Sequence, residues 1–177
     1  MPRTRQPDAV ALLKQDHRTV EGLFAKFESA RGKAAKAKLA QQICMELTVH
    51  QIIEEEIFYP GVKDFVDEEI YTEAYVEHDG SKVLIAEIEG GASDDSFYDA
   101  KVKVLSEMIK HHVKEEEQRD GMFAQAKRNG ADLEALGERL AVRKKELTAS
   151  FRKSGVPAPE TRVMKGGKLN QADLAEA

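Results

Sequence analysis

The chain has 177 residues, of which 41% are apolar, 33% charged and 6% aromatic, and its formal net charge is −5. These values predict one globular domain that is large enough for an apolar core. The mild negative charge is not offset by a block of basic residues, which argues against a nucleic-acid partner. No apolar run reaches the roughly 18 residues of a membrane span, and the first ten residues lack the apolar core of a secretory signal. We therefore expect a cytoplasmic protein without a membrane partner.

The spacing of apolar residues predicts five helices and no strands, and so an all-α fold. Helix-breaking residues mark the ends of these helices: Gly32, Pro60-Gly61, Gly90-Gly91 and Asn129-Gly130. The expected helices cover about residues 8–31, 33–59, 67–89, 93–127 and 131–153. Gly121 is a candidate interruption within the fourth of them.

The first four helices are long, amphipathic and joined by short connections, a combination that favours an antiparallel up-down four-helix bundle. The fifth has a single apolar stripe, and we expect it to pack on the outside of the bundle. Residues 1–153 then form the bundle with its packing helix. Residues 154–177 contain proline and glycine without apolar periodicity, which predicts a flexible tail or an extended arm.

The single cysteine, Cys44, can form neither an internal disulfide nor a thiolate metal site. A metal ion would have to be bound by histidine and carboxylate side chains. At about 100° of rotation per residue, four histidines fall on the apolar faces of four different helices. These are His17, His50, His78 and His112.

Several glutamates follow these histidines at helical spacing. Glu54 stands four residues after His50, and Glu116 stands four residues after His112, so each lies one turn further along the same apolar face. Glu21 has the same relation to His17. By the same geometry, Glu55, Glu56 and Glu117 project away from these faces and should be solvated. His111 with Glu115 is the alternative register of the fourth helix.

A single inward histidine is usually a hydrogen-bonded core residue, so a hydrogen-bonded polar layer is the alternative to a metal site. A buried ionised carboxylate, however, must pair, bind a metal or take up a proton. Four inward histidines and two inward glutamates therefore favour a metal centre. Four imidazoles and two bridging carboxylates supply eight of the roughly twelve bonds of two six-coordinate ions. Glu21, water or a small molecule could supply others, and the donors suit iron best, with zinc or manganese as substitutes.

At these positions the sequence resembles the hemerythrin-like HHE cation-binding domains. Their pattern H-HxxxE-H-HxxxE is similar to His17, HQIIE at 50–54, His78 and HVKEE at 112–116, flanked here by LLKQDHRTVEGLF and EEEIFYP. The resemblance covers about residues 8–126. It implies a four-helix bundle with a di-iron centre that meets oxygen, nitric oxide or peroxide, or that senses iron. It also implies that the four histidines are terminal ligands and that Glu54 and Glu116 are bridges.

The function is left open between two classes. The H-x4-D ending of oxygen-carrying hemerythrins is not evident, and a donor set rich in carboxylate favours ferric iron, so we do not expect simple oxygen transport. A di-iron protein that binds or senses a small molecule and a di-iron enzyme that consumes peroxide both remain, with a metal-free helical interaction module as a third candidate. Ferritin-like oxidases are disfavoured, because they use a Glu-x-x-His motif whereas histidine precedes glutamate here.

Overall fold

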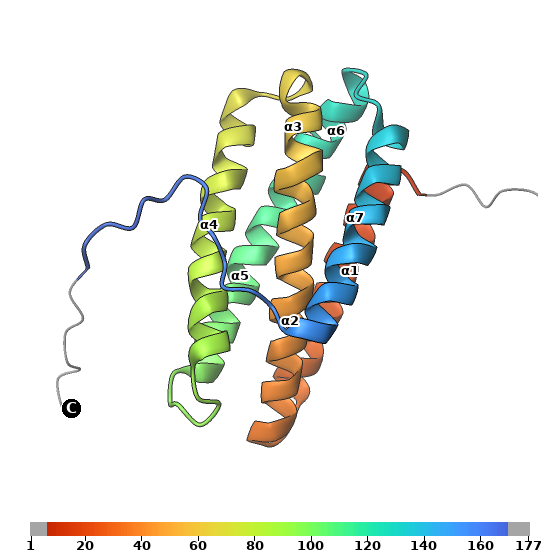
Figure 1. The fold of residues 1–177 in the computed structure, drawn as a ribbon. Coiled ribbons are helices and arrows are strands. Elements are labelled where there is room, and N and C mark those ends of the chain that lie inside the picture. The colour runs from red at the N-terminus through yellow and green to blue at the C-terminus, as the bar shows by residue number, and fades with distance from the viewer. Residues whose placement is uncertain (1–6, 170–177) are drawn as a thin grey trace, which may run out of the picture.

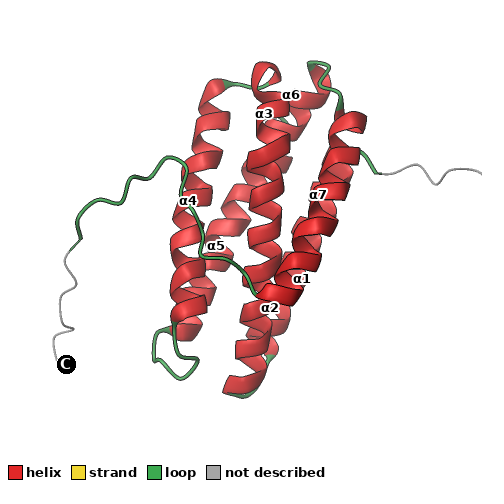
Figure 2. Ribbon diagram, in the orientation of Figure 1, coloured by secondary structure: helices red, strands yellow, loops and turns green. Residues whose placement is uncertain are grey.

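The computed structural model describes residues 7–169, and this part of the chain is helical, without strands (Figure 2). The four long helices of the bundle are α1 (Ala9–Ser29), α2 (Lys33–Ile53), α4 (Glu68–Gly90) and α5 (Tyr98–Glu117). A further helix, α7 (Leu133–Ser154), packs outside them against α1 and α2 (Figure 1). The predicted all-α bundle with an additional C-terminal helix is confirmed. None of the described helices is both long and apolar enough to cross a lipid bilayer.

Local signals in the sequence explain where α1 and α7 begin. The carboxylate of Asp8 accepts a hydrogen bond from the backbone N–H of Ala11 at 2.8 Å, and Asp132 caps Ala135 in the same way at 3.0 Å. Gly32 separates α1 from α2 with a φ of 90°, a conformation that glycine adopts without a Cβ clash. These boundaries therefore follow from residue chemistry alone.

The second long helix does not end at Pro60-Gly61, as the sequence had suggested. It continues through a π-helical turn, η1 (Glu54–Phe58), into α3 (Tyr59–Val62) and a 3-10 turn, η2 (Lys63–Phe65). Pro60 is tolerated because it stands in the first turn of α3. The wider π turn changes which side chains point into the bundle after Ile53.

The predicted fourth helix is interrupted at Gly121. α5 ends at Glu117, and a short helix, α6 (Met122–Arg128), follows. A Cβ at Gly121 would lie 2.3 Å from the carbonyl oxygen of Glu115, so only glycine allows the chain to turn this closely past the end of α5.

The core consists of two apolar clusters along the bundle axis. One includes Leu13, Ile53 and Phe58, and the other includes Leu47 and Leu105. Burying a large apolar side chain contributes roughly 1.5–3 kcal/mol. The polar layer described below lies between these clusters, and their burial holds it in place.

After α7, the described residues 155–169 form an extended segment that we call the strap. It leaves the end of α7, crosses α2 and reaches α4 (Figure 1). The backbone N–H groups of Arg162, Val163 and Met164 donate to the carboxylate of Asp79 on α4. The described part of the expected tail is thus an extended arm held on the bundle. Residues 170–177 of that tail, and residues 1–6 of the expected domain, lie outside the described part of the chain.

Candidate metal centre

Six of the seven predicted ligands converge in one buried layer, and each is 5% exposed or less. They form two overlapping groups, and within each group the donor atoms lie within 4.8 Å of one another. The first group contains His17, His50, Glu54 and Glu116, and the second contains Glu54, His78 and His112. Glu54 belongs to both groups.

The four histidines form two pairs within this layer. The Nε2 atoms of His17 and His50 lie 3.2 Å apart, and those of His78 and His112 lie 3.1 Å apart. Each carboxylate spans the two pairs. Oε2 of Glu54 lies 3.1 Å from His50 Nε2 and 3.3 Å from His78 Nε2. Glu116 reaches His17 Nε2 at 3.3 Å with Oε2, and His112 Nε2 at 3.6 Å with Oε1.

A second carboxylate faces the Nδ1 atom of every histidine from outside the layer. The pairs are His17 with Glu117 (2.7 Å), His50 with Asp16 (3.6 Å), His78 with Glu55 (3.0 Å) and His112 with Glu77 (2.7 Å). A carboxylate at this position favours the proton on Nδ1 and turns the Nε2 lone pair inward. This is the usual environment of metal-binding histidines.

The buried carboxylates also leave unsatisfied atoms. Oε1 of Glu54 and Oε2 of Glu116 have no hydrogen-bond donor among the described residues. Leaving a buried carboxylate without compensation costs several kcal/mol, and a cation between the histidine pairs would supply that compensation. The residues present therefore fit a bound metal.

Protons provide part of the compensation in the metal-free chain. Burial lowers the pKa of His50, but the charges of Glu54 and Asp16 outweigh burial and raise this pKa to about 10. Burial raises the pKa of Glu54, but His50 and His78 hold it well below its ordinary value. The layer thus contains imidazolium and carboxylate in contact, and a metal ion would compete with these protons.

Comparison with known proteins agrees with this geometry. Residues 8–124 match the protein-family model of the hemerythrin HHE cation binding domain. The chain belongs to this family. The Nostoc sp. protein "DNA nickase" is 28% identical to this HHE chain over 118 residues, which are 67% of this chain and 33% of that protein. The HHE chain therefore spans about a third of the length of that relative.

A solved structure shows the same fold. It is a hemerythrin HHE cation-binding domain-containing protein from Mycobacterium kansasii, with a TM-score of 0.72 and 24% identity. The match covers 85% of this HHE chain and 95% of the M. kansasii chain. The fold of this chain is thus a known architecture.

We call the buried layer of four histidines and two glutamates the HHE layer. The helical pattern of the sequence did not reveal one further member of it, Tyr59, which is fully buried. Its hydroxyl oxygen is close to four of the predicted ligand atoms. It lies 3.0 Å from His78 Nε2, 3.2 Å from Glu116 Oε1, 3.4 Å from His112 Nε2 and 3.5 Å from Glu54 Oε2. Tyr59 stands five residues after Glu54, about 140° away in a regular helix. The π turn closes a hydrogen bond from Tyr59 N–H to Glu54 C=O and so brings the two residues to one side.

The expectation that Glu55 and Glu117 are solvated is wrong. Glu55 is 7% exposed and contacts His78, because the π turn rotates it inward. Glu117 is at the end of α5, and its long side chain folds back to His17. Glu56 does remain at the surface, where it pairs with Arg143 at 2.7 Å.

Three other predicted candidates lie outside the layer. The side chain of Glu21 is 37% exposed and pairs with Arg18 at 3.0 Å, so it does not join the six residues. The side chain of His111 is 58% exposed and contacts Glu77. Glu115 accepts a hydrogen bond from Gln118. The structure therefore brings His112 and Glu116 into the HHE layer rather than the alternative register.

A small apolar cavity of about 10 Å³ lies beside the four histidines. Its apolar wall consists of Val20, Leu47, Ile109 and Val113. A volume of this size is about that of one water-sized probe. Only a molecule of very few atoms fits next to the layer without movement of the bundle.

Proposed function

We propose that the protein binds two iron ions and uses them to bind or sense a small molecule such as oxygen, nitric oxide or peroxide, or to sense iron itself. The observation that carries this proposal is that Glu54 and Glu116 each span from one histidine pair to the other. Two cations could then each receive two imidazoles and share both carboxylates. Bound iron would supply redox chemistry and open positions for a small ligand.

His17 and His50 would hold one ion, and His78 and His112 the other. Imidazole and carboxylate donors suit iron or manganese, and zinc is a plausible substitute. The outer carboxylates would orient the rings and strengthen them as donors. The adjacent cavity of about 10 Å³ supports a ligand of one or two non-hydrogen atoms rather than a larger substrate.

A second candidate is an enzyme that consumes peroxide with the same two irons. The position of Tyr59 favours it, because a buried hydroxyl beside the His78–His112 pair could donate a proton to a bound small molecule. Burial, Glu116 and Glu54 keep the pKa of this hydroxyl well above its ordinary value, so the proton is retained in the metal-free chain.

The similarity to the DNA nickase does not extend the proposal to DNA. The matched region accounts for a third of that protein, and the match does not place the nicking activity in this third. The net charge of −5 also lacks the basic footprint expected of a nucleic-acid binder. We therefore keep a small molecule as the proposed partner.

The test is metal analysis of protein purified from iron-rich medium, followed by optical spectra with and without oxygen, peroxide and nitric oxide. We expect about two irons per chain from the donor count. Rapid turnover of peroxide would favour the enzyme, whereas a stoichiometric or reversible spectral change would favour the sensor. Protein that takes up neither iron, manganese nor zinc would overturn the proposal and favour the metal-free interaction module.

A further inference from the structure

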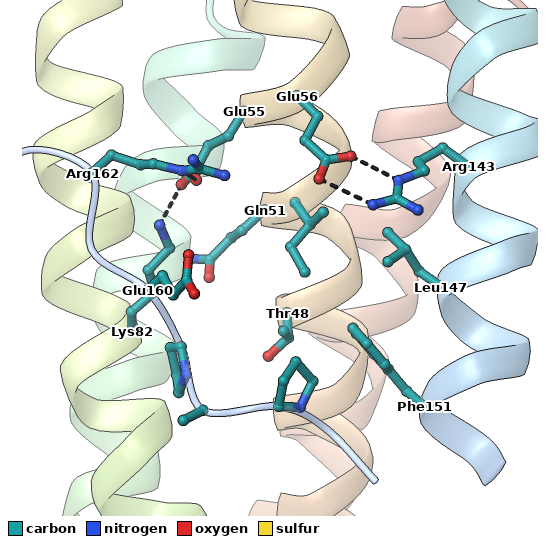
Figure 3. Close-up of a pocket in the computed structure, with 14 residues that line it drawn as sticks. Thr48, Gln51, Glu55, Glu56, Lys82, Arg143, Leu147, Phe151, Glu160 and Arg162 are labelled. Carbon is teal, nitrogen blue, oxygen red and sulfur yellow. Dashed lines mark hydrogen bonds and ion pairs between the residues drawn. The ribbon is translucent and has the colours of Figure 1, made fainter. Parts of the chain in front are cut away.

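Three of the four carboxylates behind the histidines, those of Asp16, Glu55 and Glu117, pair with lysine or arginine, and two of these cations come from outside the four-helix bundle. Lys144 of α7 pairs with Asp16, which faces His50. Arg162 of the strap donates from Nε to Oε2 of Glu55 at 2.9 Å. Figure 3 shows Arg162 reaching from the strap to Glu55. The C-terminal part of the chain therefore contacts the surroundings of both histidine pairs.

Glu55 is the link between the strap and the candidate metal centre. Its Oε1 atom lies 3.0 Å from His78 Nδ1 and accepts a hydrogen bond from Lys82 Nζ at 2.6 Å. Its Oε2 atom accepts the hydrogen bond from Arg162. Arg162 and Lys82 thus hold the two oxygens of one buried carboxylate, and this carboxylate orients the ring of His78.

The strap is attached to α4 by a single acceptor group. Arg162 N–H donates to both oxygens of Asp79, at 2.8 Å and 2.9 Å. The next two N–H groups, of Val163 and Met164, donate to Oδ2 of Asp79 at 2.7 Å and 2.8 Å. Successive backbone N–H groups that converge on one carboxylate form charge-assisted hydrogen bonds. They fix the backbone of Arg162 at the distance from which its guanidinium reaches Glu55.

Between the end of α7 and Asp79, the strap covers a cavity of about 280 Å³. Pro157 and Pro159 of the strap line it, together with Thr48 and Ile52 of α2. This stretch spans a hollow whose wall includes Leu147 and Phe151 at the edge of the first apolar cluster, and no described residue of the strap belongs to either cluster. Lifting the strap would therefore uncover that edge without unpacking the clusters. The hydrogen bonds of the strap to Asp79 and Glu55 are then the contacts that hold the strap on the bundle.

We propose that the strap is a releasable clamp on the metal centre and that Arg162 is its positioning residue. The inference rests on the proposed function, because it assigns a role to Arg162 only through the metal-binding ring of His78. With the strap in place, Arg162 holds Glu55 in position and its positive charge partly neutralises the carboxylate. His78 is then held with Nε2 directed at the metal. With the strap released, Glu55 keeps Lys82 but can turn away from His78, and the ion at His78 and His112 is held less firmly.

The test compares Arg162→Gln with Arg143→Gln as a matched control. Arg143 lines the same cavity and pairs with Glu56 at 2.7 Å and 3.1 Å, and no contact of Glu56 with a histidine is found in residues 7–169. Each protein is loaded with cobalt(II), its visible spectrum is recorded, and loss of metal to an excess of chelator is followed. Far-UV circular dichroism verifies that each variant is folded.

We expect Arg162→Gln to lose one of its ions about 10-fold faster than the parent and to alter the cobalt spectrum, as expected for a residue behind a metal ligand. Arg143→Gln should match the parent in both measurements. Arg162→Lys keeps the cation and should restore most of the slow release. Asp79→Asn removes the charge that anchors the strap and also the ion pair of Asp79 with Lys82 at 3.2 Å, while it leaves in place the residues of the hydrogen bond from Lys82 to Glu55. It should also speed release while the amides of residues 162–164 exchange hydrogen faster.

The outcomes separate the two proposals. If the parent binds two ions and both Arg162→Gln and Asp79→Asn release them at the parent rate, the clamp is wrong and the metal centre stands. The clamp is also wrong if Arg143→Gln has the same effect as Arg162→Gln, because loss of any cation at the cavity would then suffice. A parent protein that binds no metal overturns the proposed function and the clamp together.

Discussion

The Nε2 atoms of His17 and His50 face each other at 3.2 Å, with the two rings nearly perpendicular at 73°. Two neutral imidazoles cannot both accept a hydrogen bond across this distance, so a proton or a metal ion must lie between the nitrogens. In the metal-free chain the proton resides on His50, whose pKa is raised to about 10 by Glu54 and Asp16 against the opposing effect of burial. Metal binding and protonation are therefore mutually exclusive at this pair.

This competition predicts opposite pH responses for the two forms. The folded-state pKa of His50 lies above its ordinary value of 6.5, so the proton stabilises the metal-free fold fully below pH 6.5. That contribution, about 1.4 kcal/mol per pKa unit, is lost as the pH rises towards 10. We expect the melting temperature of the metal-free protein to fall between pH 6.5 and 9, while the increase caused by bound metal grows. Thermal unfolding of both forms across this range is the measurement, and a metal-induced increase that shrinks with pH would contradict it.

Glu54→Gln should remove the bridge while preserving the shape of the side chain. Glu54 is fully buried and contacts His50 and His78, so loss of its charge should leave the protein with one ion or none. Breaking the buried ion pair should also destabilise the metal-free form by about 3 kcal/mol. The control is Glu56→Gln, two residues away, whose exposed pair with Arg143 contributes within about 0.5 kcal/mol. Metal content and thermal unfolding are measured for both, and equal metal content would end the bridging assignment.

Two adjacent histidines provide a second matched pair. His112 is 3% exposed and contacts Glu116, whereas the side chain of His111 is 58% exposed. We expect His112→Ala to lose most of its metal, because it removes a ligand and leaves Glu116 unsupported. His111→Ala should keep the metal. The reverse result, measured by metal analysis after loading, would show that the centre uses the other register.

Tyr59→Phe tests the residue that the helical pattern did not reveal. The change removes the hydroxyl that lies among four ligand atoms but keeps the ring that packs against Tyr75. Because a buried acceptor loses its donor, we expect the metal-free protein to lose about 1–3 kcal/mol of stability and the metal-loaded protein to change its optical spectrum. Tyr71→Phe, which removes a half-buried hydroxyl from the same aromatic group, is the control and should leave the spectrum unchanged. Identical spectra in both variants would place Tyr59 outside the metal centre.

Gly137→Ala and Gly22→Ala should change stability in opposite directions. A Cβ at Gly137 on α7 would lie 2.6 Å from the backbone oxygen of Pro7 and 2.8 Å from the nitrogen of Ala9, so it should push α7 from α1 and cost about 1–3 kcal/mol. A Cβ at Gly22 meets no atom within 4 Å in the described structure, and alanine there should stabilise the helix by about 0.5–1 kcal/mol. Denaturant unfolding measures both. A Gly137→Ala protein as stable as the parent would show that α7 packs less closely than the structure indicates.

The sequence by itself determined the four long helices of the bundle, and it determined which of the main candidate ligands point into the bundle. Helical rotation of about 100° per residue is a local property, so the inward faces could be read from apolar spacing alone. It placed His50 and Glu54 on one face, and His112 and Glu116 on another, as the structure does. The bundle class followed from the same local rule, because four amphipathic helices with short connections must cover one another's apolar faces.

Only the tertiary structure decided what surrounds these ligands. The π turn after Ile53 moved Glu55 and Tyr59 inward, and a rule that assumes regular helical rotation cannot anticipate such a turn. The other supports join residues far apart in the chain: Glu117 faces His17, Lys144 pairs with Asp16, and the strap reaches Asp79. Such contacts depend on which helix surfaces pack together and on how far a flexible side chain extends. Local periodicity contains neither quantity, so the outer carboxylates and their cations became visible only once the helices were assembled.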